Sequence, residues 1–230
     1  MVRRPLAVVL ALGLLASGCG GDDDHGSAPT TTSEPPTTTV DEPRAFVSSV
    51  EEVTAEDLYA SWRPGCPLPV EELRLLRVPH WGFDGEVHGG RIVVAADVVD
   101  DVLAVLADLY EARYPIERME PVDQFGGSDE ASMDANNTSG FNCRLATGGT
   151  GWSEHAYGRA VDVNPLQNPF VRGDSVLPPQ SARYTDRSLD EPGMIREGDT
   201  AVTAFARVGW IWGGTWQTSK DYQHFSPSGR

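Results

Sequence analysis

Cysteine is scarce in this chain, which has only three cysteines in 230 residues, and no two of them form a Cys-x-x-Cys pair. A metal site built from paired cysteines is therefore not expected. Basic residues are also few, because 18 lysines and arginines stand against 34 aspartates and glutamates, which gives a net charge of −16. This acidic balance argues against nucleic-acid binding, which depends on a positive surface.

The chain also lacks a long apolar run at its N-terminus. Residues 6–15 are apolar but too few to span a bilayer as a stable helix, and they follow Arg3 and Arg4, so we interpret residues 1–18 as a secretory signal. Small residues lead directly into Cys19, a pattern that resembles the lipobox of bacterial lipoproteins, whose cysteine carries the lipid. The alternative is an ordinary signal peptide that ends near a cysteine. We favour the lipoprotein and expect an extracytoplasmic protein, lipid-anchored to the outer face of the cell membrane.

Large apolar side chains are nearly absent from residues 19–45, which are rich in threonine, proline and aspartate. Such a segment cannot bury enough surface to offset the entropy of ordering it, so we predict a disordered tether. His25 lies in this tether and is discounted as a metal ligand. Residues 46–230 show no repeat and are long enough for one domain with a substantial core.

If Cys19 carries lipid, Cys66 and Cys143 remain as a pair. In an exported protein an even number of remaining cysteines usually means a disulfide, and we predict one here. The alternative is two buried free thiols.

Hydrophobic periodicity and capping residues predict a mixed secondary structure. We expect helices over residues 54–62, 97–113 and 199–209, one or two strands within 86–94, strands over 116–122, 160–163 and 210–212, and a long polar loop over 125–142. Helices and short strands are mixed without a regular βαβ rhythm. The pattern favours an α+β fold in one domain, with an antiparallel sheet flanked by helices.

Two segments carry candidate chemistry. The first, SEHAYGRAVDVNP at residues 153–165, places His155 seven residues before Asp162, and the second, DYQHF at residues 221–225, adds His224 with Asp221 three residues before it. Two imidazoles and one carboxylate suffice as protein ligands for a catalytic zinc, which keeps a further position open for water. Asp221 would then be free to act as the base. The alternative is that all four are ordinary polar residues, but Gly158 and several aromatic residues around both segments favour a site.

The combined motif SxHxxGxAxDVNP followed by GWxWGGxW and DYxHF resembles the VanY-type zinc D-alanyl-D-alanine carboxypeptidase family, which includes L-alanyl-D-glutamate endopeptidases. The resemblance extends over roughly residues 89–225 and implies a hedgehog/DD-peptidase-like fold. It implies Zn²⁺ as cofactor, His155, Asp162 and His224 as its ligands, and Asp221 as catalytic base. Arg144 matches an arginine that faces the substrate in relatives; the alternative for Arg144 is a structural salt bridge.

Other polar and aromatic residues have secondary parts in this interpretation. Ser153 and Asn164 flank the candidate ligands and are expected to orient them. His80 and His88 match no ligand position. The remaining pair, Trp212 and Trp216, could form either core or cleft wall.

These inferences predict a membrane-tethered zinc peptidase that acts as a D-Ala-D-Ala carboxypeptidase on the stem peptides of peptidoglycan. An endopeptidase that cuts between L-Ala and D-Glu is one alternative, and a cell-wall-binding lipoprotein without catalysis is another. The expected partners are stem peptides and, through the lipid anchor, the membrane; we expect a monomer and no nucleic acid.

Overall fold

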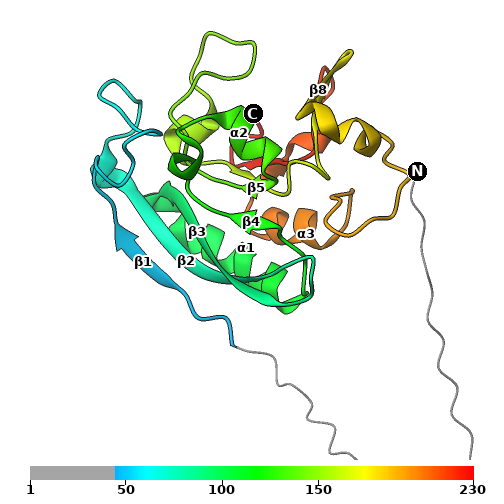
Figure 1. The fold of residues 1–230 in the computed structure, drawn as a ribbon, viewed down its shortest axis with the longest axis horizontal. Coiled ribbons are helices and arrows are strands. Elements are labelled where there is room, and N and C mark those ends of the chain that lie inside the picture. Colours follow the sequence, from blue (N-terminus) through cyan, green and yellow to red (C-terminus); the bar gives the residue numbers. More distant parts are fainter. Residues whose placement is uncertain (1–44) are drawn as a thin grey trace, which may run out of the picture. The chain divides into compact units, whose positions relative to one another are not determined.

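A computed structural model of the chain describes residues 45–230 (Figure 1). The predicted signal peptide, Cys19, His25 and almost all of the predicted tether lie outside the described residues. Among the helices of the described part, none combines the length and the apolar character needed to traverse a bilayer.

The largest sheet has three antiparallel strands in the order β1-β2-β3. It comprises β1 (Ser49–Glu52), β2 (Leu73–Trp81) and β3 (Val87–Ala95), with Leu76 opposite Ile92 in the β2–β3 register. The strand expected within residues 86–94 is confirmed as β3. Its long partner β2 was not predicted, although buried and less buried residues alternate along part of it.

Helix α1 (Val99–Glu111) packs against β2 and lies behind the sheet in Figure 1. It confirms the helix expected over residues 97–113, except that a 3₁₀ turn (Ala96–Val98) replaces its first residues. Its buried side chains are Val102, Val105, Leu106, Leu109 and Tyr110. The helix stops before Pro115, which cannot donate the backbone hydrogen bond that a further turn needs.

Three small sheets build the other half of the domain. One antiparallel sheet has the order β10-β7-β8, from β7 (Phe170–Arg172), β8 (Ser175–Leu177) and β10 (Lys220–Asp221). A second antiparallel sheet has the order β6-β11-β9, from β6 (Val161–Asp162), β9 (Ile211–Trp212) and β11 (His224–Ser226). A short parallel pair joins β4 (Arg118–Met119) to β5 (Asn137–Thr138).

The α+β class is therefore confirmed, but antiparallel pairing is divided among several small sheets instead of one. The hedgehog-like arrangement implied by the resemblance stays a prediction. Strands expected over residues 160–163 and 210–212 are confirmed as the shorter β6 and β9.

Helix α3 (Thr200–Arg207) confirms the expected helix after residue 199. The Asp199 carboxylate accepts a hydrogen bond from the Val202 amide at 3.0 Å, which caps the helix N-terminus. The domain also contains 3₁₀ turns at Val70–Glu72, Val122–Phe125, Glu154–Tyr157, Pro179–Thr185 and Gly213–Thr215.

Three local predictions were wrong. Residues 55–61 form turns and not a helix, although Thr54 and Asp57 do make the expected reciprocal cap, with the Asp57 amide 3.3 Å from Thr54 Oγ1. The strand expected over residues 116–122 is reduced to β4, because Pro121 lacks an amide hydrogen and starts a 3₁₀ turn. The polar loop expected over residues 125–142 contains α2 (Asp129–Asp134), whose N-terminus Ser128 caps.

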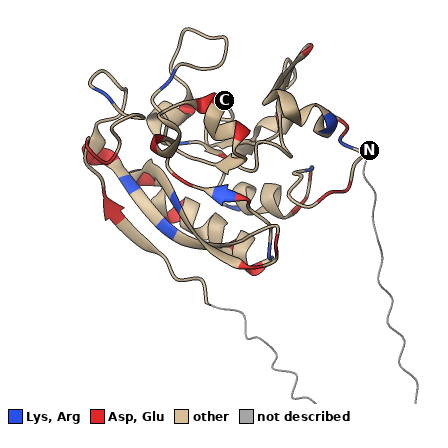
Figure 2. Cartoon of the chain, in the orientation of Figure 1, with Lys and Arg blue, Asp and Glu red and all other residues tan. Residues whose placement is uncertain are grey.

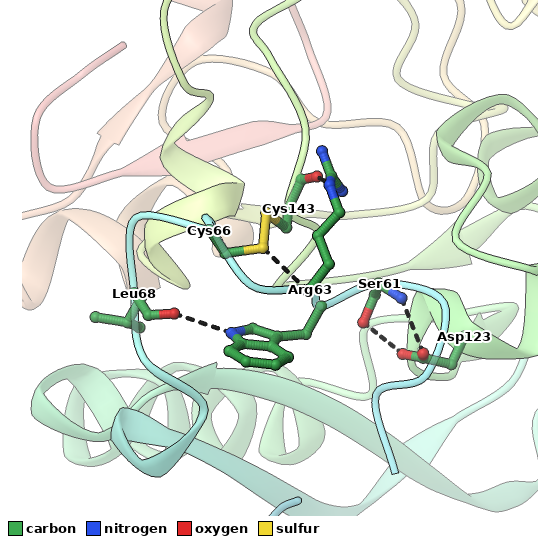
Figure 3. The surroundings of a disulfide bond; sticks show 7 residues. Ser61, Arg63, Cys66, Leu68, Asp123 and Cys143 are labelled. Carbon is green, nitrogen blue, oxygen red and sulfur yellow. Dashed lines mark hydrogen bonds between the residues drawn. A yellow bond between two sulfur atoms is a disulfide. The ribbon is translucent and has the colours of Figure 1, made fainter. Parts of the chain in front are cut away.

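A disulfide joins Cys66 to Cys143, as predicted, and links segments 77 residues apart (Figure 3). Beside it, the Arg63 guanidinium donates to the Cys143 carbonyl at 2.9 Å. The buried Asp123 carboxylate lies nearby and accepts hydrogen bonds from the Ser61 hydroxyl and amide. The disulfide therefore attaches the chain just before Arg144 to the N-terminal part of the domain.

Acidic residues are distributed over many elements, whereas β2 and β3 carry the basic residues Arg74, Arg77 and Arg91 (Figure 2). Arg77 on β2 pairs with Glu51 on β1, and Arg91 on β3 pairs with Glu120. Much of the positive charge on this sheet is thus already matched by carboxylates.

Candidate active site

The three predicted metal ligands converge on one buried point. His155 Nε2 lies 3.1 Å from Asp162 Oδ2, and His224 Nδ1 lies 3.1 Å from Asp162 Oδ1. The two imidazole nitrogens are 3.2 Å apart. All three side chains are buried, and their candidate ligand atoms lie within 4.8 Å of one another.

Strand pairing brings two of these residues together. In the antiparallel β6–β11 pair, His224 stands directly opposite Asp162, although the two are 62 residues apart in the chain. Residues directly opposite in such a pair carry their side chains on the same face of the sheet. The register therefore places imidazole beside carboxylate.

His155 reaches the same point from a 3₁₀ turn. The Ser153 hydroxyl caps this turn by accepting from the His155 amide at 3.3 Å, as expected for a residue that orients a ligand. Gly158 ends the turn with a φ of +63°, and a Cβ there would lie 2.6 Å from the Ala95 nitrogen. Only glycine allows both that conformation and this close approach to β3.

Hydrogen bonds on the far side of each ring assign the nitrogen that faces the cluster. His155 Nδ1 lies 2.6 Å from the Gly140 carbonyl oxygen, so Nδ1–H donates there and Nε2 keeps its lone pair. For His224 the roles are reversed, because Nε2 lies 2.9 Å from the Arg230 carbonyl oxygen and Nδ1 faces Asp162. Carbonyl partners of this kind orient metal-binding histidines.

The donor set fits zinc. Two neutral imidazoles and a carboxylate match a common catalytic set, and tetrahedral ligands at 2.0–2.2 Å from zinc stand about 3.3–3.6 Å apart. The observed separations of 3.1–3.2 Å are close to that spacing. In the metal-free protein, burial alone would raise the pKa of Asp162, but His155 and His224 in their protonated form outweigh it through charge and hydrogen bonding and hold that pKa well below its usual range. The carboxylate is therefore ionised, as a ligand must be.

Asp221 lies on β10, which pairs with β7, and it is not one of the three converging ligands. Its Oδ1 atom is buried without a hydrogen-bond partner among the described residues. Burial, and then the negative charge of Asp162, raises the pKa of Asp221 to about 7. A carboxylate with such a pKa can take up and release a proton near neutral pH, which is the property of a general base.

Comparison with known proteins gives one match, to residues 147–227. This segment matches the family of D-alanyl-D-alanine carboxypeptidases. The match confirms the resemblance inferred from the motifs over residues 147–225, whereas the part expected over residues 89–146 is not matched. The carboxypeptidase match contains His155, Asp162, His224 and Asp221. No curated protein and no solved structure matches the chain.

Arg144 lies outside the carboxypeptidase match and precedes it by three residues. Its Nε atom lies 2.8 Å from Asp129 Oδ1, so the salt bridge considered as an alternative is present. Arg144 also lines a cavity whose wall includes His155, His224 and Asp221, and its positive charge opposes the rise in the pKa of Asp221. Asp129 comes from α2, in the segment that the sequence suggested was only a loop.

A cavity of about 520 Å³ opens over the cluster. Aromatic residues form much of its wall, and Trp216 stands with its ring centroid 5.5 Å from that of His224. Trp212 does not line this cavity; it is buried, and its indole nitrogen donates to the Tyr222 carbonyl at 2.8 Å. Of the two tryptophans, Trp216 is cleft wall and Trp212 is core.

The other predicted and discounted residues lie elsewhere or act differently. His80 and His88 stack on each other on β2 and β3 and do not line the cavity. Asn164 bonds to the Glu117 amide and the Pro115 carbonyl, so it supports that segment and not a ligand. Among residues the motifs did not single out, Arg172 of β7 does line the cavity.

Proposed function

We propose that this protein is a zinc-dependent D-Ala-D-Ala carboxypeptidase that removes the terminal D-alanine from peptidoglycan stem peptides. The observation that carries the proposal is the convergence of His155, Asp162 and His224 within the segment that matches the carboxypeptidase family. A cavity of about 520 Å³ lies against the two histidines and is lined by both aromatic and charged residues.

His155 Nε2, His224 Nδ1 and the Asp162 carboxylate would hold the zinc. When bound, zinc would act as a Lewis acid on the scissile carbonyl and make water a stronger nucleophile near neutral pH. The carbonyl groups of Gly140 and Arg230 fix the two rings in the orientation that this requires.

Asp221 would perform the proton transfers. Its carboxylate, which lines the cavity, accepts a proton from the attacking water and then delivers it to the nitrogen of the leaving D-alanine. A pKa near 7 suits both directions, because the group is neither too weak to accept the proton nor too basic to release it. Arg144, oriented by Asp129, would balance the negative charge that develops on the substrate carbonyl oxygen.

The test measures D-alanine release from a stem pentapeptide by the purified full chain, loaded with zinc. We expect release that a chelator abolishes and added zinc restores. Asp221→Asn should lower kcat by 10²- to 10⁴-fold, which is the usual contribution of a general base. Asp174→Asn, an exposed aspartate in the β7–β8 turn, serves as a matched control and should leave kcat unchanged.

Mass spectrometry of digested muropeptides separates the alternatives. If the products are cut between L-Ala and D-Glu, the protein is an endopeptidase and the proposed carboxypeptidase activity is wrong. Zinc-loaded protein that binds peptidoglycan but yields no product of either kind would favour the cell-wall-binding lipoprotein.

We also propose that Cys19 carries a lipid that anchors the protein to the outer face of the cell membrane, as a monomer on a tether. Cys19→Ser should shift the protein from the membrane fraction to the soluble extracytoplasmic fraction. Persistence of the variant in the membrane fraction would refute the anchor.

A further inference from the structure

Arg172 is an exposed residue on β7 whose side chain is nevertheless held at the edge of the cavity. One of its terminal nitrogens donates to the Thr147 carbonyl at 3.3 Å, and its guanidinium carbon lies 5.7 Å from the centre of the Phe170 ring. Gly148 gives it room, because a Cβ at that position would collide with the guanidinium. Contacts from two segments thus fix the direction of a side chain that would otherwise move freely in solvent.

The charge of Arg172 is not matched by a carboxylate. Within residues 45–230, no aspartate or glutamate oxygen comes within 4.0 Å of its guanidinium nitrogens, whereas Arg144 in the same cavity pairs with Asp129 at 2.8 Å. Arg118 and Arg230 also lack such a partner among the described residues, but Arg118 lies away from the cavity. The lack of a partner at Arg172 matters because this side chain lies at the cavity edge. It leaves a planar pair of N–H donors available to an anion from outside.

The register of β7 against β10 gives the approximate distance along the strand between Arg172 and Asp221. Phe170 stands opposite Asp221 in the β7–β10 pair, and Arg172 follows two residues later on the same face. Two strand residues span about 7 Å, and one residue of an extended peptide spans about 3.5 Å. The Arg172 side chain is long enough to contact a group on the substrate one residue beyond the scissile peptide bond, at which Asp221 is proposed to transfer protons.

We propose that Arg172 binds the free α-carboxylate of the leaving residue and thereby selects substrates that end in a free acid over substrates that carry an amide there. The proposal rests on the proposed function, since it names the specificity residue of the same site. A guanidinium pairs with a carboxylate through two parallel charged hydrogen bonds, which a neutral amide in the same position cannot match. A substrate whose chain continues through the α-carboxyl of the leaving residue has such an amide there.

The experiment compares an acyl-D-Ala-D-Ala peptide with the same peptide carrying a C-terminal amide, using the zinc-loaded full chain. For the wild type we expect kcat/KM to favour the free acid. In Arg172→Ala this preference should fall by about tenfold, mostly through KM, because one charged hydrogen-bonded pair is lost at a partly exposed site. Arg172→Lys should keep part of the preference, since lysine retains the positive charge but lacks the two parallel N–H donors of the guanidinium.

Arg118→Ala is the matched control, because Arg118 is also exposed and lies on β4 away from the cavity. Its acid-to-amide ratio should equal that of the wild type. An unchanged ratio in Arg172→Ala overturns the proposal, as does a loss of preference in Arg230→Ala alone, since Arg230 also lines the cavity. Thermal unfolding of each variant shows whether it is folded.

Failure of the proposed function is distinguishable from failure of this inference. If the wild type cleaves neither peptide, the affinity of the zinc-loaded protein for each is measured by calorimetry. Weaker binding of the acid, but not of the amide, in Arg172→Ala then supports carboxylate recognition without catalysis. Equal binding of both peptides to the wild type overturns it.

Discussion

Replacing Asp221 by asparagine should stabilise the metal-free protein, and more so at high pH. The side chain is held in the cavity wall with Oδ1 buried and unpartnered, and burial together with the charge of Asp162 raises its pKa from 3.8 to about 7. In the unfolded chain no such environment exists. Ionised Asp221 therefore opposes folding, and an uncharged side chain of the same shape removes that penalty.

The sign and size follow from the two pKa values. Well below pH 3.8 the carboxyl group is protonated in both states and costs nothing; the penalty grows as the pH rises and is complete above pH 7. Each unit of difference between the folded-state and unfolded-state pKa corresponds to about 1.4 kcal/mol, so the rise from 3.8 to about 7 gives a full penalty of about 4 kcal/mol. We halve it because the residue keeps partial exposure, which leaves about 2 kcal/mol at pH 8 and about 0.5 kcal/mol at pH 4.5.

The measurement is thermal unfolding of chelator-treated wild type and Asp221→Asn at both values of pH. For a domain of this size the Tm of the variant should exceed that of the wild type by about 4–8 °C at pH 8 and by about 1–2 °C at pH 4.5. Asp174→Asn, in an exposed turn, should show no such pH-dependent gain. Equal shifts at the two values of pH, or a lower Tm for Asp221→Asn at pH 8, would refute the argument that burial activates this carboxylate.

Three further outcomes are expected. Zinc at one hundred times its Kd should raise the free energy of unfolding of the wild type by about 2.7 kcal/mol, and calorimetry should find this gain lost in His155→Ala. Reduction of the Cys66–Cys143 disulfide should destabilise the folded state by about 4 kcal/mol, because the bridge closes a long loop; urea unfolding with and without reductant measures this, and an unchanged midpoint contradicts it. Asp123→Ala should cost about 3 kcal/mol by the same measurement, since it leaves the Ser61 amide and hydroxyl without their buried acceptor; a cost below 1 kcal/mol would show that water replaces the carboxylate.

Much of the local structure could be predicted from neighbouring residues. Helix α1 follows from apolar side chains at three- and four-residue spacing with Pro115 beyond its end, and α3 follows from the Asp199 cap and Gly209. The same local logic failed at α2, a helix of six residues that is too short to show a hydrophobic period. It also failed at residues 55–61, where a correct capping pair starts only turns.

The candidate site divides in the same way. The residue types of His155, Asp162 and His224, together with the family resemblance of their motifs, predicted a zinc-binding set, because ligand chemistry belongs to the side chains themselves. Arg172 could not be identified, because nothing in its neighbouring residues shows that Phe170 lies opposite Asp221. Its approach to the cavity depends on the pairing of Phe170 with Asp221, which are 51 residues apart in the chain.

The sequence by itself determined which chemical groups this protein can offer, that helices form at α1 and α3, and which cysteines can pair. Only the tertiary structure decided that His224 faces Asp162 across β6 and β11, that Arg144 is paired while Arg172 is not, and that Asp221 is buried enough to have a raised pKa. The physical reason is the distance along the chain between the residues that interact. Helical periodicity and capping act between residues a few positions apart, whereas strand register, burial and charge pairing depend on residues that only the folded chain brings together.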